Sequence, residues 1–147
     1  MKILLDTNVI LRCTNPGAPE HAAVVESIRG IVSRGDTCCV CAQSIAEIWA
    51  VLTRPIVANG YGLEPDDTRA RIDTILSTLT LLPDSPGLFA AWLDLCSSHQ
   101  VRGRQVFDAR IVALMSTTGI ARLVTLNPTD FTRFSMIEVI VPRTGLE

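Results

Sequence analysis

Short apolar segments alternate with longer amphipathic segments along this chain, and that alternation constrains its fold more than any other feature. Strand-like segments are expected at residues 2–5, 37–41, 80–82, 122–125 and 137–141. Apolar residues at helical spacing cover residues 7–13, 19–34, 44–53, 65–79, 86–96 and 106–117, with Leu76 and Phe89 assigned to inward faces. Because helices separate most of the strands, parallel pairing with right-handed crossovers is expected. The sequence predicts an α/β fold, a three-layer sandwich in which helices flank a short central parallel sheet.

The length and composition fit one domain, which we expect over residues 1–145. The chain has 147 residues, of which 48% are hydrophobic and 19% charged, a composition unlike that of disordered chains. Its uninterrupted apolar runs are far shorter than the roughly 18 residues of a membrane span. Asp6 ends the first apolar stretch too early for a secretory signal, so a cytoplasmic protein is expected. Leu146 and Glu147 are expected to be residues added in cloning, outside the fold.

Five cysteines indicate a reducing compartment, because their number is odd and three of them lie within four residues. Cys38, Cys39 and Cys41 could suggest a zinc site, but no second Cys/His pair at ligand spacing accompanies them. The interpretation we favour is that these three are small buried residues of a strand, since free cysteine is among the most buried residue types.

Acidic and amide side chains recur where predicted strands lead into helices. Asp6 ends the first strand, and Glu47 and Asp108 lie in the first turns of two otherwise mostly apolar helices. Each has a structural explanation when taken alone: Asp6 as a helix N-cap, and the other two as acids that favour the positive end of a helix dipole. Asn127 and Asp130 can likewise be read as turn residues.

The coincidence of these positions favours a shared site. Ligands of open parallel sheets bind beyond the carboxyl ends of the strands, where all these residues and Thr125 are expected to lie. Oxygen ligands that converge there would repel each other unless a hard cation such as Mg²⁺ or Mn²⁺ neutralised them. A cation of that kind can polarise phosphoryl oxygen and activate water.

Arginine predominates among the basic residues and is concentrated near this predicted site. Residues 99–134 carry five arginines against Asp108 and Asp130, although the whole chain has a formal net charge of −2. Because the guanidinium group suits phosphate recognition, arginines of this stretch are candidates for RNA binding. The candidates are Arg102, Arg104 and Arg110.

Four segments, taken together and in order, resemble the PIN-domain ribonucleases, especially the VapC-type toxins. They are residues 4–11 (LLDTNVIL), 44–47 (SIAE), 106–113 (VFDARIVA) and 123–131 (LVTLNPTDF). The resemblance covers essentially the whole chain and implies Asp6, Glu47 and Asp108 as catalytic, metal-coordinating acids, with Asn8 and Thr125 in support. The fourth acidic position of the family falls on Asn127, so whether Asn127, Asp130 or neither completes the site stays open.

The resemblance implies an Mg²⁺- or Mn²⁺-dependent endoribonuclease that hydrolyses RNA phosphodiester bonds with metal-activated water. It also implies a homodimer and a VapB-type antitoxin as partner. One alternative is an RNA-binding module of the same fold that does not cleave, which the three intact acids argue against. A second is a phosphatase or phosphoacceptor domain that uses Asp6 as nucleophile, but position 8 is Asn and Lys2 is the only lysine.

Overall fold

A five-stranded parallel sheet forms the centre of the molecule in this computed structural model, which describes residues 1–143. The strand order is β3-β2-β1-β4-β5. The strands are short and comprise β1 Lys2–Leu5, β2 Thr37–Cys41, β3 Thr80–Leu82, β4 Arg122–Val124 and β5 Glu138–Ile140. Every neighbouring pair is parallel, with β1 at the centre. The predicted fold is confirmed, and the expected boundary at residue 145 and the assignment of residues 146–147 lie outside the described residues.

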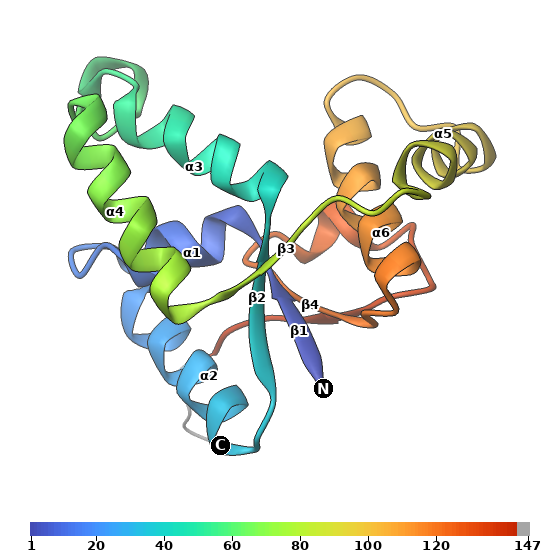
Figure 1. Ribbon diagram of the computed structural model, residues 1–147, viewed down its shortest axis with the longest axis horizontal. Helices are drawn as coiled ribbons and strands as arrows, with labels where there is room; N and C mark the ends of the chain where they lie inside the picture. The colour runs from blue at the N-terminus through green and yellow to red at the C-terminus, as the bar shows by residue number, and fades with distance from the viewer. Residues whose placement is uncertain (144–147) are drawn as a thin grey trace.

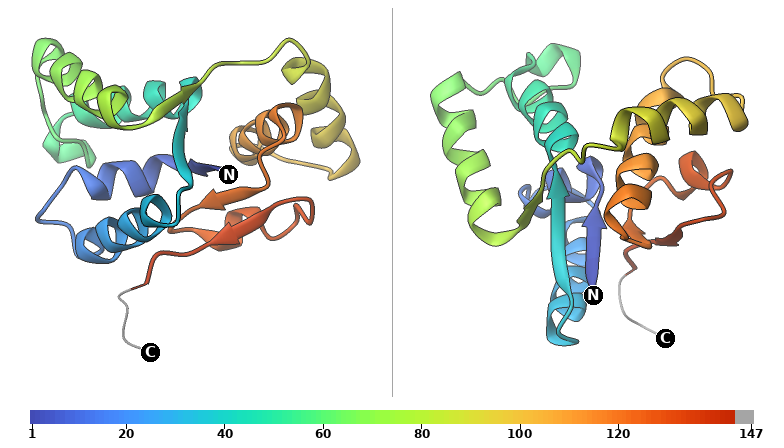
Figure 2. Two further views of the ribbon diagram at one scale, coloured as in Figure 1. Left: turned by 60° about the horizontal axis from the view of Figure 1, so that its bottom comes forward. Right: turned by 45° about the vertical axis from the view of Figure 1, so that its right-hand side comes forward.

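Six α-helices cover the two faces of the sheet, with α1 to α4 on one side and α5 and α6 on the other (Figure 1). Their bounds are α1 Thr7–Cys13, α2 His21–Ser33, α3 Ala42–Thr53, α4 Pro65–Thr78, α5 Leu88–Ser98 and α6 Gln105–Thr118. Two 3₁₀ turns, Ile56–Ala58 and Pro128–Phe131, lie in segments that the sequence pattern left without regular structure. The other views show the same three layers (Figure 2).

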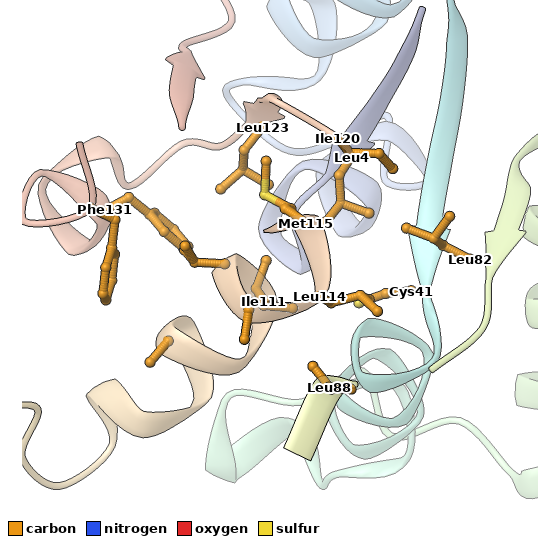
Figure 3. Close-up of a cluster of buried hydrophobic side chains, with 14 of the residues drawn as sticks. Leu4, Cys41, Leu82, Leu88, Ile111, Leu114, Met115, Ile120, Leu123 and Phe131 are labelled. Carbon is orange, nitrogen blue, oxygen red and sulfur yellow. The ribbon is translucent and has the colours of Figure 1, made fainter. Parts of the chain in front are cut away.

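Side-chain alternation along the central strand divides the core in two. Ile3 and Leu5 point into the cluster under α1 to α4, whereas Leu4 points into the cluster under α6. Figure 3 shows the second cluster, in which Leu4, Leu123 and Met115 pack together. Both faces of β1 are therefore buried, as expected for a parallel sheet between helical layers.

The three clustered cysteines are buried in β2, as predicted. Cys39 and Cys41 belong to the cluster under α6, and Cys38 belongs to the cluster on the opposite face. Burial raises the pKa of the Cys38 thiol to about 11, so this group stays protonated near neutral pH. Among the helices of residues 1–143, none has the length and apolar character needed to cross a membrane.

Leu76 and Phe89, both assigned to inward helix faces, are exposed instead. Leu76 is 37% exposed and Phe89 is 69% exposed. Each directly follows a buried helical residue, Ile75 and Leu88, and successive helix residues point about 100° apart. Because α4 and α5 each pack through a narrow stripe, the next residue along turns away from the core.

Candidate functional site

Asp6 follows β1 directly, at the carboxyl edge of the sheet, and both of its carboxylate oxygens accept hydrogen bonds. Oδ1 accepts the backbone N–H of Thr7 at 2.8 Å, so Asp6 does cap α1. Oδ2 accepts the hydroxyl of Thr125 at 2.7 Å. Burial raises the pKa of Asp6, these two hydrogen bonds lower it, and the charges of Glu47 and Asp130 raise it again. The capping role and membership of a charged cluster therefore coexist in one residue.

Glu47 reaches the same edge from α3 and is held on both sides. Its Oε2 accepts the hydroxyl of Thr7 at 2.6 Å, and its Oε1 accepts the amide of Gln43 at 3.0 Å. Thr7 and Gln43 were not among the residues predicted from the sequence. Neither one carries a charge. The Thr7 contact depends on how α1 and α3 are placed, whereas Gln43 lies one helical turn before Glu47 in α3, a spacing that could have indicated the contact.

Asp108 lies in the first turn of α6 and is partly buried. Its pKa is raised from 3.8 to about 6, mainly by burial and then by the charges of Asp130, Asp6 and Glu47. Charge effects of this kind act over short distances, so four acids from four different segments share one region of the surface. The structure thus brings together the three predicted acids and adds Asp130.

The two candidates for the fourth position differ in their surroundings. Asp130, in the 3₁₀ turn after β4, is close enough for its charge to raise the pKa of both Asp6 and Asp108. Asn127 instead contributes a backbone N–H, which donates to Thr125 Oγ1 at 3.1 Å. Asp130 therefore acts electrostatically on two of the predicted acids, and whether Asn127 or Asp130 completes the site stays a prediction.

The predicted supporting residues join β4 to the start of α1. The Asn8 side chain donates to Thr125 Oγ1 at 3.4 Å and accepts the backbone N–H of Leu126 at 3.2 Å. Thr125 is fully buried, and its hydroxyl donates a hydrogen bond to Asp6 Oδ2. Asn8 and Thr125 therefore fix the position of Asp6.

The three predicted RNA-binding arginines have different environments. Arg102 and Arg104 are exposed in the segment between α5 and α6. Arg110, on α6, donates to Gln43 Oε1 at 3.0 Å and to Asp84 Oδ2 at 2.7 Å. Arg102 and Arg104 are accessible to RNA from solvent, and their role in RNA binding stays a prediction. Arg110 already has two protein partners.

The donor chemistry of this cluster fits a hard divalent cation. In the described part of the chain, no three His, Cys, Asp or Glu side chains lie close enough together to form a ready-made metal site. Mg²⁺, however, keeps several waters and is usually bound through only one or two carboxylates. A cation would also relieve the repulsion that raises the pKa of Asp6 and Asp108. Its protein ligands would come from among Asp6, Glu47, Asp108 and Asp130, with water completing the coordination.

Comparison with known proteins gives relatives over the whole length of the chain. The chain is 28% identical over 143 residues to Ribonuclease VapC24 of Mycobacterium tuberculosis (strain CDC 1551 / Oshkosh), which covers 96% of this chain and 97% of the relative. Among solved structures, VapBC2 from Rickettsia felis bound to a DNA fragment from their promoter has a TM-score of 0.74 at 16% identity, covering 96% of this chain and 98% of that one. A toxin-antitoxin complex from Klebsiella pneumoniae has a TM-score of 0.63 at 18% identity, with the same coverage.

A family model matches most of the chain, including the segments that carry the four acids. The model, described as PIN domain, matches residues 3–135. The match begins inside β1, just before Asp6, and extends beyond Asp130, so it contains all four clustered acids. The chain therefore belongs to the PIN domain family.

Proposed function

We propose that this protein is a divalent-metal-dependent endoribonuclease and the toxin of a toxin–antitoxin module. The observation that carries the proposal is the convergence of four acids on one end of the sheet: Glu47 shares Thr7 with the turn that Asp6 caps, and the charges of Glu47 and Asp130 raise the pKa of both Asp6 and Asp108. The relative named Ribonuclease VapC24 supports RNA as the substrate. The structural neighbour described as a toxin-antitoxin complex supports the biological setting.

Each residue of the site has a role in this proposal. The four acids would hold Mg²⁺ or Mn²⁺, and the bound cation would supply polarisation of the scissile phosphate and activation of water. Thr125 and Asn8 keep Asp6 in place through the hydrogen bonds described above. Arg102 and Arg104, exposed beside the start of α6, would bind flanking phosphates of the RNA.

The test is cleavage of a single-stranded or loop RNA by the purified protein. We expect cleavage with Mg²⁺ or Mn²⁺, none in excess chelator, and restored cleavage when the cation is added back. A DNA of matched sequence should be cut more slowly. Undiminished cleavage in chelator would contradict the metal dependence, and RNA binding without cleavage under all these conditions would favour a binding module of the same fold.

We propose a VapB-type antitoxin and a second copy of this chain as protein partners, in the cytoplasm. The names VapBC2 and toxin-antitoxin complex of the structural neighbours support the first partner. An antitoxin segment that covers the acids and the exposed Arg102 would inhibit by competing with RNA or cation. Co-expression with a VapB-type antitoxin that binds this protein should restore growth, and sedimentation of the free protein should give twice the chain mass of 16.0 kDa.

A further inference from the structure

A chain of hydrogen bonds joins Glu47 to Asp84, in the segment that follows β3. Gln43 Nε2 donates to Glu47 Oε1 at 3.0 Å, and Gln43 Oε1 accepts from Arg110 Nη1 at 3.0 Å. Arg110 Nη2 in turn meets Asp84 Oδ2 at 2.7 Å, in an ion pair. The three segments that supply this chain of contacts, the start of α3, the segment after β3 and the start of α6, meet at one edge of the sheet (Figure 2).

Arg110 decides which way the Gln43 amide points. A guanidinium group has only donors, so the group of Gln43 that faces Arg110 must be its carbonyl oxygen. The NH₂ group is thereby directed at Glu47, and its second hydrogen reaches the backbone carbonyl of Phe107 at 3.0 Å. If the amide were rotated by half a turn, an oxygen would face the Glu47 carboxylate and an NH₂ group would face Arg110.

Asp84 in turn fixes Arg110. Its carboxylate takes one end of the guanidinium, which leaves the Nη1 end for Gln43. The side chains of Arg110 and Asp84 are only 32% and 46% exposed. Because the pair is partly buried and linked to a third group, it defines a geometry better than an isolated surface pair does.

We propose that Gln43 is a positioning residue for Glu47, and that Arg110 and Asp84 act through it. The inference rests on the proposed function, because the position of Glu47 matters when that carboxylate helps to hold a cation. Thr7 secures Oε2 of Glu47 by a bond of 2.6 Å, and Gln43 secures Oε1, so the carboxylate plane is set from both sides. Partners of this kind commonly change metal affinity by about 10- to 100-fold when they are removed.

The first experiment measures Mn²⁺ binding by calorimetry in the absence of RNA, so its readout does not depend on cleavage. Gln43→Met keeps the length of the side chain and removes both hydrogen-bonding groups, and we expect Mn²⁺ to bind about tenfold more weakly. The control is Gln105→Met, the same exchange at an exposed position at the start of α6, for which wild-type affinity is expected. Melting temperatures should show that both variants fold.

The second experiment separates positioning from a general structural effect. Asp84→Asn should weaken Mn²⁺ binding several-fold in the wild-type background and have no further effect in Gln43→Met, because Asp84 acts through Gln43. Equal losses in both backgrounds, or wild-type affinity in Gln43→Met, would overturn this inference and leave the proposed function intact. A wild-type protein that binds no Mn²⁺ would overturn both.

Discussion

The hydroxyl of Thr125 donates a hydrogen bond of 2.7 Å to Oδ2 of Asp6, across 119 positions of sequence. This contact follows from strand register, because Leu5 pairs with Val124 and the next residue of each strand is Asp6 or Thr125. The Thr125 oxygen also accepts from Asn8 and from the backbone N–H of Asn127. One buried hydroxyl therefore joins the end of β4 to the acid that begins α1.

We expect Thr125→Val to lower both stability and activity. The exchange keeps the branched shape but removes a hydrogen bond to a charged group, which costs about 1.5 to 3 kcal/mol of unfolding free energy. Cleavage should fall because Asp6 loses its partner. Thr125→Ser keeps the hydroxyl and should retain most of the activity. Chemical denaturation and RNA cleavage of both variants check this, and equal activity of Val and Ser would contradict a role for the hydroxyl.

Asp6→Asn and Asp108→Asn should each abolish RNA cleavage and growth toxicity while the fold is retained. Each exchange preserves the shape of the side chain and removes a charge from the proposed cation site. Asn also caps helices well, so α1 keeps its N-cap in Asp6→Asn. Circular dichroism and cleavage assays should show folded, inactive proteins. Wild-type activity in either variant would leave that acid with a structural role alone.

The pH dependence of stability should reveal the raised pKa of Asp108. Its pKa is about 6 in the folded protein against an ordinary value of 3.8, so the folded state binds this proton more tightly than the unfolded state. Stability is therefore lost as pH rises between these values and stays lower above them. Asp108→Asn removes this loss and should stabilise the metal-free protein at neutral pH by about 1 kcal/mol, since partial exposure weakens the effect.

Urea denaturation at neutral pH and near pH 4 provides the measurement. The stabilisation by Asp108→Asn should disappear near pH 4, where wild-type Asp108 is protonated in the folded state. If the difference in unfolding free energy between Asp108→Asn and the wild type does not change with pH, the pKa of Asp108 is not raised in the folded protein. The same raised pKa predicts that Mn²⁺ binding by the wild type weakens as the pH falls through about 6, because protons then compete for this carboxylate.

The sequence predicted the helices, the strands and the parallel three-layer fold, but not the order of the strands or most contacts between side chains. Asp6, Glu47 and Asp108 could be found because charges are rare in apolar segments that end at one edge of a parallel sheet. Gln43 lies one helical turn before Glu47, but the contact that orients its amide could not be predicted, because its partner Arg110 lies 67 positions away. Sequence spacing also could not decide between Asn127 and Asp130, because the positions of their side chains depend on the short 3₁₀ turn that contains Asp130.

Asp130 rather than Asn127 should complete the cation site. Asp130→Asn removes a charge that acts on Asp6 and Asp108, so we expect weaker Mn²⁺ binding and slower cleavage. Asn127→Ala keeps the backbone N–H that bonds to Thr125 and should change Mn²⁺ binding by less than about twofold, within the range of surface substitutions. The reverse order of effects in calorimetry would assign the fourth position to Asn127.

Arg102 and Arg104 should form the phosphate-binding part of the site. Both are exposed just before α6, whose first turn carries Asp108, whereas Arg29 and Arg34 lie at α2, a helix on the opposite face of the sheet. Charge reversal at Arg102 or Arg104 should weaken RNA binding and reduce its salt dependence by about one counterion per lost phosphate contact. Reversal at Arg29 or Arg34 makes the same change in net charge and is the matched control.

Binding is best measured in the Asp108→Asn background, which prevents cleavage, over a series of salt concentrations. If all four reversals reduce affinity equally, RNA binding depends only on net charge. That result would contradict the predicted phosphate-binding role of Arg102 and Arg104 without contradicting the nuclease assignment.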